Sequence, residues 1–191
     1  MIYLASKSPR RRQLLEQLGI EYDVLAVDID ETWDGTERAQ DHVSRLALEK
    51  ARKGVNLSTS SLPVLAADTQ VVLDDDILGK PKDGDEAVSM LQKLSGRNHF
   101  VYSAVALIHH GVEKTSLNIS RVSFRPMGDA EISVYCDSEE PYGKAGAYAI
   151  QGRAAAFISR LEGSFSGVMG LPLYETAELL QGVIEQKIGV S

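Results

Sequence analysis

The sequence is poor in cysteine and has no long apolar run, and each shortage excludes a class of protein. Cys136 is the only cysteine among 191 residues, so an intramolecular disulfide is impossible, and we expect a buried small side chain there. No apolar run has the length of a membrane span. The basic cluster near the N-terminus follows the first apolar residues, which is the reverse of a signal peptide. We therefore expect a cytoplasmic protein.

Positive charge is also scarce. The chain has 20 Lys and Arg residues against 27 Asp and Glu residues, which gives a formal net charge of -7. An acidic chain does not attract nucleic acid or anionic membrane over its whole surface. Aromatic residues make up 6% of the chain and do not alternate with basic residues as on a nucleic-acid-binding surface. We predict no nucleic-acid partner and no membrane partner, and any anion site must be local.

Several familiar catalytic motifs are missing as well. The sequence has no Walker loop, no G-x-S-x-G elbow and no G-x-G-x-x-G after a strand. Its histidines lack the spacing of metal ligands, and the adjacent pair is expected in a turn. The four histidines are His42, His99, His109 and His110.

Segments with helical and strand periodicity alternate along the chain. Strands are predicted at residues 2–5, 22–29, 63–73, 77–78, 99–108, 112–124 and 154–161, and helices at residues 9–18, 37–53, 83–94, 129–136 and 172–184. Turn-forming residues at 74–76 and 109–111 indicate hairpins, whereas other connections pass through helices. The pattern predicts an α/β fold with a mixed sheet. Residues 1–191 contain no repeat or linker, so we expect one domain.

Three consecutive arginines, residues 10–12, stand at the start of the first predicted helix. Ser8 is expected to cap this helix and Pro9 to begin it. The positive end of a helix dipole disfavours cations unless an anion binds there. Serine hydroxyl groups and the free N–H groups of the helix start complete a candidate phosphate site, for which a solvated basic patch is the alternative. The candidate phosphate ligands are Ser6, Ser8, Arg10 and Arg11.

Two charged residues are predicted at buried positions. Lys50 lies at i+4 from Leu46 and i+7 from Val43, near the centre of an apolar helix face, so its ammonium group needs an anion or must reach the surface. Glu49 is a candidate partner for it. Asp68 interrupts an apolar strand, and its carboxylate therefore requires a metal, a cation or strong hydrogen bonds. A structural aspartate held by backbone donors is the alternative.

Two weaker signals extend this set of charges. Lys80 follows the first predicted hairpin, within reach of the strand that carries Asp68, and Glu31 opens a polar loop after the second strand. A few basic groups together with one or two carboxylates suit a phosphate and a divalent cation.

A series of short motifs also follows one order along nearly the whole chain. The motifs are Ser6-x-Ser8-Pro9-Arg10-Arg11, Glu49-Lys50-Ala51, Ala67-Asp68-Thr69, Lys80-Pro81, Glu140-Pro141, Lys144-Ala145-Gly146-Ala147-Tyr148, Ile150-Gln151-Gly152, Gly163-Ser164 and Gly170-Leu171-Pro172. Each motif is short, but the ordered series closely resembles that of the Maf-like proteins.

The resemblance implies an elongated mixed sheet with flanking helices and two lobes around a cleft, related to the inosine triphosphate pyrophosphatase architecture, and commonly a homodimer. Maf-like proteins hydrolyse nucleoside triphosphates to the monophosphate and pyrophosphate with a divalent cation, Mg²⁺ or Mn²⁺. They are associated with removing non-standard nucleotides and with cell-division arrest. By position, Asp68 matches the catalytic acidic residue, and Asp68 and Glu31 are the expected metal ligands. Positions around the phosphates and metal are matched by Ser6, Arg10, Arg11, Glu31, Lys50 and Lys80.

Within the family, Arg11, Thr69 and Gln151 resemble the base-selecting residues of the dTTP/UTP pyrophosphatase subgroup. Threonine and glutamine can hydrogen-bond the carbonyl and N–H edge that uracil and thymine share. Lys7 and Gln70 stand at positions that are often smaller or apolar in relatives, which leaves fine specificity open. Two other functions stay open: a nucleotide-binding septation regulator with incidental hydrolysis, and a purine-directed pyrophosphatase of the same fold.

Overall fold

The structure, a computed structural model, describes residues 1–184. Its strands are β1 (Ile2–Leu4), β2 (Tyr22–Val24), β3 (Val64–Leu73), β4 (Asp76–Leu78), β5 (Asn98–His109), β6 (Val112–Phe124) and β7 (Ile158–Glu162). Its α-helices are α1 (Pro9–Gln17), α2 (Ala39–Leu57), α3 (Gly84–Leu94), α4 (Asp129–Cys136), α5 (Phe165–Met169) and α6 (Leu173–Leu180), and its 3-10 helices are η1 (Ala145–Ala147) and η2 (Arg153–Phe157).

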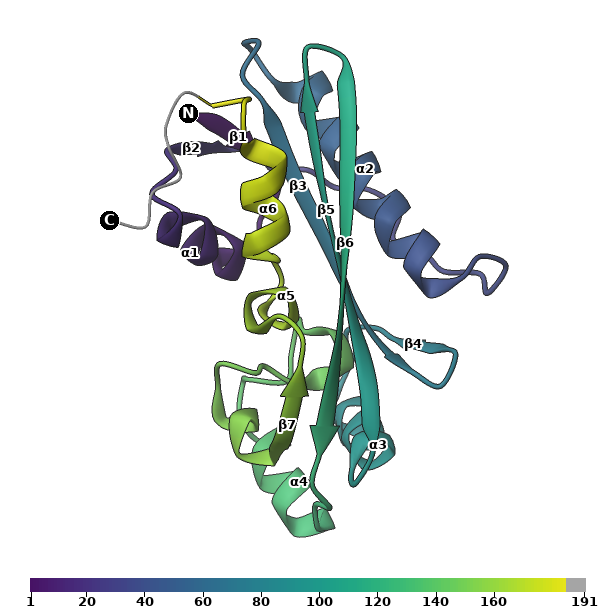
Figure 1. Ribbon diagram of the computed structural model, residues 1–191. Coiled ribbons are helices and arrows are strands. Elements are labelled where there is room, and N and C mark those ends of the chain that lie inside the picture. The colour runs from purple at the N-terminus through teal and green to yellow at the C-terminus, as the bar shows by residue number, and fades with distance from the viewer. Residues whose placement is uncertain (185–191) are drawn as a thin grey trace.

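One mixed sheet runs along the elongated molecule, and the long hairpin of β5 and β6 forms its spine (Figure 1). The strand order is β2-β1-β3-β5-β6-β7, with β4 paired to β3 as well. The pairs of β1 with β2 and with β3 are parallel, whereas the other pairs are antiparallel. The predicted α/β class with an elongated mixed sheet and flanking helices is confirmed.

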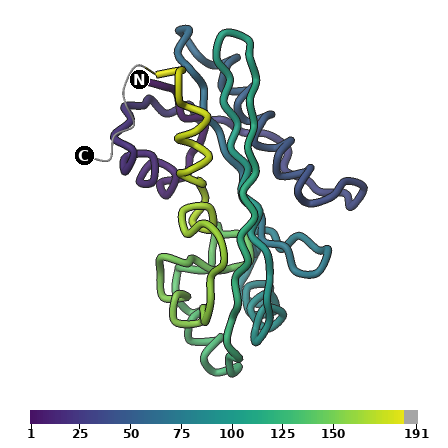
Figure 2. Tube along the Cα trace, viewed as in Figure 1, coloured from purple at the N-terminus to yellow at the C-terminus, as the bar shows by residue number. Residues whose placement is uncertain are grey.

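Helices cover both faces of this sheet. Even-numbered residues of β3, such as Val64 and Ala66, pack in a cluster with apolar residues of α2. Odd-numbered residues, such as Leu65 and Val71, pack in a second cluster with residues of α1, α3, α4 and α6. This alternation follows from the two-residue period of a strand. Figure 2 shows that the chain returns at its end, so that α6 lies beside the N-terminal segment.

Local sequence chemistry accounts for the elements that were predicted closely. His110 and Gly111 both have positive φ, 49° and 76°, as a two-residue hairpin turn requires, so the turn predicted there is confirmed. Asp83 caps α3 by accepting a hydrogen bond from the Glu86 N–H at 2.9 Å. Cys136 is buried at the end of α4, as expected.

The strand predicted at residues 22–29 is wrong in its second half, because β2 ends at Val24. In a parallel pair the length of one strand is limited by its partner, and β1 ends at Leu4. Beyond one further hydrogen bond, from the Leu25 N–H to the Leu4 carbonyl, the chain has no strand to pair with. It leaves the sheet and enters the polar segment that carries Glu31.

The strand predicted at residues 154–161 is displaced. Residues 153–157 form η2, and β7 occupies residues 158–162. The carboxylate of Glu140 accepts hydrogen bonds from the N–H groups of Arg153 and Ala154, which favours a helical start at this point. The last helix is also shorter than the predicted range of 172–184, because α6 ends at Leu180, and the short helix α5 was not predicted.

Helix α2 begins two residues later and ends four residues later than the predicted range of 37–53. Gly54 does not end the helix, because the helix packs closely against the sheet at this residue. A methyl group placed on Gly54 would lie 2.8 Å from side-chain atoms of both Ala5 and Val64. The absence of a side chain therefore allows α2 to approach β1 and β3.

A gap in the sheet positions the site. Strand β1 pairs with β3 only at Val64 and Leu65, and β4 pairs with β3 only from Val71 onward. Between them, residues 66–70 of β3 pair with β5 on one edge and have no strand on the other. Polar residues of β3 therefore border an opening between the end of β1 and the end of β4.

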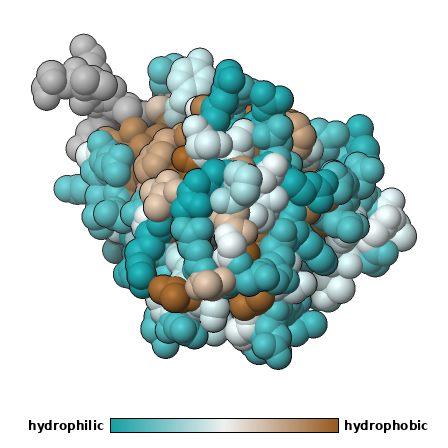
Figure 3. Space-filling view, turned by 90° about the horizontal axis from the view of Figure 1, so that it is seen from below, coloured by the Kyte–Doolittle hydropathy of each residue, from teal (hydrophilic) through white to brown (hydrophobic). Residues whose placement is uncertain are grey.

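The face of the molecule seen from below is largely hydrophilic (Figure 3). Seen from below in Figure 3, hydrophobic residues lie mostly in small patches among hydrophilic ones. Within residues 1–184, no helix combines the length and apolar composition needed to cross a membrane.

Candidate active site

A cleft of about 700 Å³ opens at the gap in the sheet. It is lined from the residues between β1 and α1 and the start of α1, and from the segment 27–33. Further lining comes from α2 and β3, from the end of β4, and from the segments 143–151 and 168–170. Every residue that the sequence nominated for the site lines this cleft. These residues are Ser6, Ser8, Arg10, Arg11, Glu31, Lys50, Asp68, Thr69, Lys80 and Gln151.

Two lysines and two carboxylates form a cluster inside the cleft. The Nζ of Lys50 lies 2.5 Å from Oδ1 of Asp68 and 2.5 Å from Oε1 of Glu31. The Nζ of Lys80 lies 3.2 Å from Oε2 of Glu31. The predicted pairing of Lys50 with Glu49 is wrong, because Glu49 points to the other side of the helix and pairs with Arg45 at 3.0 Å.

Burial gives this cluster its strength. Lys50 is 8% exposed and Asp68 is 6% exposed, so each charge depends on the other for compensation. Burial alone would raise the pKa of Glu31, but the ammonium groups of Lys50 and Lys80 outweigh it and lower the pKa to about 2. The Glu31 carboxylate is therefore ionised near neutral pH.

Arginines at the start of α1 also line the cleft. Ser8 occupies the position before the helix, but its side chain makes no capping hydrogen bond, so the predicted cap is wrong. Instead the Ser8 N–H donates to Oγ of Ser6 at 3.2 Å, and Nη1 of Arg11 donates to the same oxygen at 3.3 Å. The Ser8 hydroxyl group is left for another partner. Arg12 is exposed and does not line the cleft.

Arg11 and Thr69 meet at one backbone carbonyl. Nε of Arg11 donates to the Gly170 carbonyl at 2.9 Å, and Oγ1 of Thr69 donates to it at 3.3 Å. Thr69 Oγ1 also lies 2.8 Å from Oγ of Ser103, its neighbour on β5. Burial lowers the pKa of Arg11, and Asp68 and Glu31 only partly oppose this. The two predicted base-selecting residues are thus held together by the segment after α5.

Gln151, the third predicted base-selecting residue, is exposed to the cleft at the end of the segment 143–151. Two close contacts fix this segment. Gly146 has φ 66°, and a methyl group on it would lie 2.9 Å from Cγ1 of Val71. A methyl group on Gly152 would lie 2.4 Å from Oε2 of Glu140. Glycine is required at both positions, because any side chain would push the segment away from its support.

Lys144 is a cleft residue that the sequence did not single out beyond its motif. Burial and the nearby Arg10 lower the pKa of Lys144, and burial also lowers the pKa of Arg10. Within residues 1–184, neither cation forms an ion pair. Two desolvated cations close to each other favour a bound anion beside them. The sequence did not predict this role, because the glycine-rich segment around Lys144 has no helical or strand periodicity.

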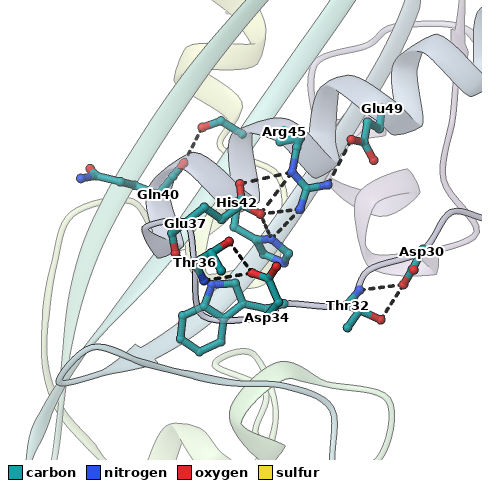
Figure 4. A network of polar contacts seen from close by, with 11 residues as sticks. Asp30, Thr32, Asp34, Thr36, Glu37, Gln40, His42, Arg45 and Glu49 are labelled. Carbon is teal, nitrogen blue, oxygen red and sulfur yellow. Dashed lines mark hydrogen bonds and ion pairs between the residues drawn. The ribbon is translucent and has the colours of Figure 1, made fainter.

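A polar network beside the cleft fastens the segment that carries Glu31 to α2 (Figure 4). His42 is buried and its Nδ1 lies 2.6 Å from Oε1 of Glu37, which also pairs with Arg45. Nε1 of Trp33, a cleft residue, donates to the Glu37 carbonyl at 3.0 Å. Two local turns, in which Thr32 bonds Asp30 and Thr36 bonds Asp34, precede this anchor. The network keeps Glu31 close to Lys50.

The carboxylates of Asp68 and Glu31 fit a divalent cation of the magnesium type. Such a cation takes one or two carboxylates and completes its shell with water and substrate phosphate oxygens. Among residues 1–184 no group of three or more His, Cys, Asp or Glu residues is arranged to hold a metal. The donor set therefore matches a cation that arrives with a phosphate ligand and does not match a cation enclosed by protein alone.

The fold and cleft thus define an α/β protein with a basic and acidic site suited to a polyphosphate anion. The sequence profile described as "Maf-like protein" matches residues 1–183, and the chain belongs to the Maf family.

Curated relatives cover nearly the whole chain. The chain is 52% identical over 188 residues to a dTTP/UTP pyrophosphatase of Bordetella parapertussis, with 94% of this chain and 91% of the relative covered. It is 51% identical over 180 residues to a dTTP/UTP pyrophosphatase of Methylococcus capsulatus, with 94% and 89% covered.

A solved structure, a nucleoside-triphosphatase or dITP/XTP pyrophosphatase of Mycobacterium abscessus, is 19% identical with a TM-score of 0.47 and covers 97% of this chain and 99% of that chain. At this TM-score the likeness supports no inference about function.

Proposed function

We propose that this protein is a nucleoside triphosphate pyrophosphatase that hydrolyses dTTP and UTP to the nucleoside monophosphate and pyrophosphate. The observation that carries the proposal is the cluster of Asp68, Lys50 and Glu31, which lines the same cleft as Arg10 and Arg11. Relatives about half identical over most of the chain have the name dTTP/UTP pyrophosphatase. A role in preventing incorporation of modified pyrimidine nucleotides and in cell-division arrest belongs to the same proposal.

In the proposed step, a water oxygen forms a bond to the α-phosphorus of the nucleotide. The bond from that phosphorus to the oxygen bridging to the β-phosphate breaks, and pyrophosphate leaves with the electron pair. The carboxylate of Asp68 takes the proton of the water, since Lys50 bonds only Oδ1 of that carboxylate. Lys80 and Arg10, which both line the cleft, neutralise the charge that develops on the leaving pyrophosphate.

Asp68 and Glu31 would also hold a divalent cation, Mg²⁺ or Mn²⁺, in this proposal. When bound, such a cation supplies electrostatic stabilisation of the phosphate oxygens. Lys50 pairs with both carboxylates and so holds them close to each other in the cleft.

Base selection is proposed to rest on Arg11, Thr69 and Gln151. Arg11 and Thr69 are fixed by the Gly170 carbonyl, and Gln151 lines the same cleft. Threonine and glutamine supply both a donor and an acceptor, which matches the alternating carbonyl and N–H groups of uracil and thymine.

A nucleotide panel tests this proposal. The protein is incubated with Mg²⁺ or Mn²⁺ and with dTTP, UTP, CTP, each purine triphosphate or 7-methyl-GTP, and pyrophosphate and orthophosphate are measured separately. We expect pyrophosphate as the first product, from dTTP and UTP above the others. Release from purines alone would support the purine-directed alternative, and no release from any nucleotide would support the septation regulator. Orthophosphate as the first product would refute the position of cleavage.

Asp68→Asn is the matching variant. It keeps the size of the side chain but removes the charge that accepts the proton, so we expect turnover to fall by at least a thousandfold with the fold intact. Circular dichroism and the pyrophosphate assay measure the two effects. Asp75→Asn, in the exposed turn before β4, is the control and is expected to retain full activity. Substantial activity of Asp68→Asn would contradict the assignment of Asp68 as the proton acceptor.

A cytoplasmic homodimer completes the proposal. The homodimer accompanies the family resemblance, whereas the cytoplasmic location rests on the single cysteine and the lack of a membrane-length apolar run. Light scattering coupled to size exclusion would measure the mass in solution, and a monomer at micromolar concentration would contradict the dimer. Fractionation of cells that express the protein tests the compartment.

A further inference from the structure

One buried polar atom of the cleft has no partner. Gln70 is 7% exposed and lines the cleft, and its Oε1 makes no hydrogen bond within residues 1–184. The other buried side-chain atoms without a partner, on His99, Arg121 and Glu175, belong to residues that do not line the cleft. Leaving a buried acceptor unpaired costs about 1–3 kcal/mol, so the fold alone does not account for an amide at this position.

Gln70 stands beside Asp68 on the same face of β3. Even-numbered residues of this strand face α2, where Lys50 meets Asp68. Residues two apart on a strand are about 7 Å apart, and their side chains point the same way. A single water molecule can therefore contact the carboxylate of Asp68 and the amide oxygen of Gln70 together. No strand pairs with β3 on this edge, so the water has access from the cleft.

Oε1 of Gln70 is a hydrogen-bond acceptor, which limits the groups that can bind it. Phosphate oxygens are acceptors and cannot pair with Oε1, so the partner either donates a hydrogen or is a cation, such as the one proposed at Asp68. The N–H of the base is expected at Thr69, which points to the opposite face of β3, where Oγ1 meets Gly170 and Ser103. A sugar hydroxyl group and a water molecule are the remaining donors, and Asp68 as its neighbour favours the water.

We propose that Gln70 positions the attacking water of the pyrophosphatase reaction, an inference that rests on the proposed function. The water donates one hydrogen to Asp68 and the other to Oε1 of Gln70. These two hydrogen bonds orient a lone pair of the oxygen toward the α-phosphorus. Asp68 takes the first hydrogen as a proton when the new bond forms and pyrophosphate leaves, while the second hydrogen stays on the product phosphate. Gln70 itself gains and loses no proton.

The test replaces Gln70 by methionine, which keeps length and volume but removes the amide acceptor. Kinetics of Gln70→Met are measured with dTTP, UTP and 3′-deoxythymidine triphosphate at saturating Mg²⁺. We expect kcat to fall at least tenfold on all three, with KM within threefold of wild type. An unchanged kcat, or a loss confined to KM, would overturn the proposal. A loss that disappears with the 3′-deoxy substrate would assign Gln70 to the sugar instead of the water.

Two further measurements separate a functional from a structural role. The melting temperature of Gln70→Met is expected to equal or exceed that of wild type, because an unpaired buried polar atom is removed. Gln70→Glu keeps an oxygen acceptor at the same reach and is expected to have a higher kcat than Gln70→Met, whereas an equal loss in both would contradict the proposal. If Gln70→Met does not fold, Gln70→Val replaces it. Gln92→Met on α3, outside the cleft, is the control and is expected to keep wild-type activity. If the wild-type protein has no pyrophosphatase activity, the proposed function is refuted, and not the role of Gln70 alone.

Discussion

Lys50 brings an ammonium group into the interior, where it pairs with the carboxylates of Asp68 and Glu31. Asp68 is almost fully buried, and Lys50 is its ion-pair partner. Glu31 is more exposed and also pairs with Lys80. Removing Lys50 therefore leaves a buried carboxylate uncompensated, whereas removing the Asp68 charge leaves Lys50 paired with Glu31. Loss of Lys50 should therefore cost more stability than loss of the Asp68 charge.

We predict that Lys50→Met lowers the free energy of unfolding by about 3–5 kcal/mol, the cost of an unpaired buried charge. Asp68→Asn is expected to cost less, for the reason given above. The double variant is expected to recover most of the stability that Lys50→Met loses, because no buried charge is left unpaired in it. Urea unfolding of all four proteins measures this cycle. Additive losses in the double variant would show that the pair is not coupled.

Single residues were the part of the site that the sequence could predict best. A lysine on an apolar helix face and an aspartate within an apolar strand both break a local rule, and such breaks indicate function. The partner of Lys50 could not be predicted, because it depends on how α2 crosses β3. Gln70 broke the same rule as Asp68, but a neutral amide within a strand is a weaker signal than a charge.

At the scale of elements, the segment 139–152 depends on Glu140 and Gly152. The Glu140 carboxylate accepts hydrogen bonds from the N–H groups of Arg153 and Ala154 and from the hydroxyl group of Tyr135. Burial raises the pKa of Glu140, but these donors outweigh it and lower the pKa overall. The carboxylate thereby ties α4 to η2 and fixes the end of the segment that presents Gln151.

We predict that Gly152→Ala weakens substrate binding. Gly152 has φ -109°, which any residue can adopt, so the effect of the methyl group is steric. The methyl group would contact the Glu140 carboxylate at 2.4 Å, and the segment must move to relieve this. We expect a loss of about 1–3 kcal/mol in stability and a KM for dTTP raised severalfold. Gly19→Ala, at a position outside the cleft that has open space around it but a φ of 66°, is the control for stability alone.

A buried histidine joins β5 to the same segment. Nε2 of His99 lies 2.8 Å from the hydroxyl group of Tyr148, and its ring packs edge-on against Phe124. Burial lowers the pKa of His99 to about 4. In the unfolded chain the pKa is near 6.5, so the unfolded state binds more protons between pH 6.5 and 4. The contribution of His99 to stability is complete above pH 6.5 and decreases as the pH falls toward 4.

We predict that His99→Gln reduces this acid sensitivity. Glutamine keeps a donor for Tyr148 but does not titrate, so the wild type should lose about 3 kcal/mol more than the variant between pH 7 and pH 4. Urea unfolding at a series of pH values measures the difference. Tyr148→Phe keeps the imidazole group and is expected to retain the sensitivity. Parallel pH curves for wild type and His99→Gln would contradict the prediction.

The order and type of the main elements could be predicted, but some of their limits could not. The alternation of β3, β5 and β6 and the cap of α3 are local properties. The end of β2 depends on the length of β1, and the helical start at Arg153 depends on a carboxylate thirteen residues earlier. Local periodicity does not report contacts with distant residues, so the strands at 22–29 and 154–161 were both predicted longer than they are.

At the scale of the whole molecule, the charge of the chain and the charge of the cleft have opposite signs. The chain carries a formal charge of -7, yet Arg10, Arg11 and Lys144 line one cleft without a carboxylate partner among the described residues. Surrounding acidic surface repels polyanions such as nucleic acid, whereas a narrow cleft still concentrates the field of its own cations. This distribution selects a small anion over a large one.

Lys144 provides the test of this distribution. It lies in the cleft far from Lys80 in sequence, and burial beside Arg10 lowers its pKa, so an anionic ligand gains more from it than from a solvated lysine. We predict that Lys144→Gln raises the KM for UTP about tenfold, the loss of one charge-assisted contact, with kcat changed less than threefold. The wild-type KM should rise with salt between 50 and about 300 mM, and the slope should be smaller in the variant, because one screened charge is gone. Lys114→Gln, on the exposed part of β6, is the control and should follow the wild-type salt dependence. Equal slopes in all three proteins would place Lys144 outside the binding of the phosphates.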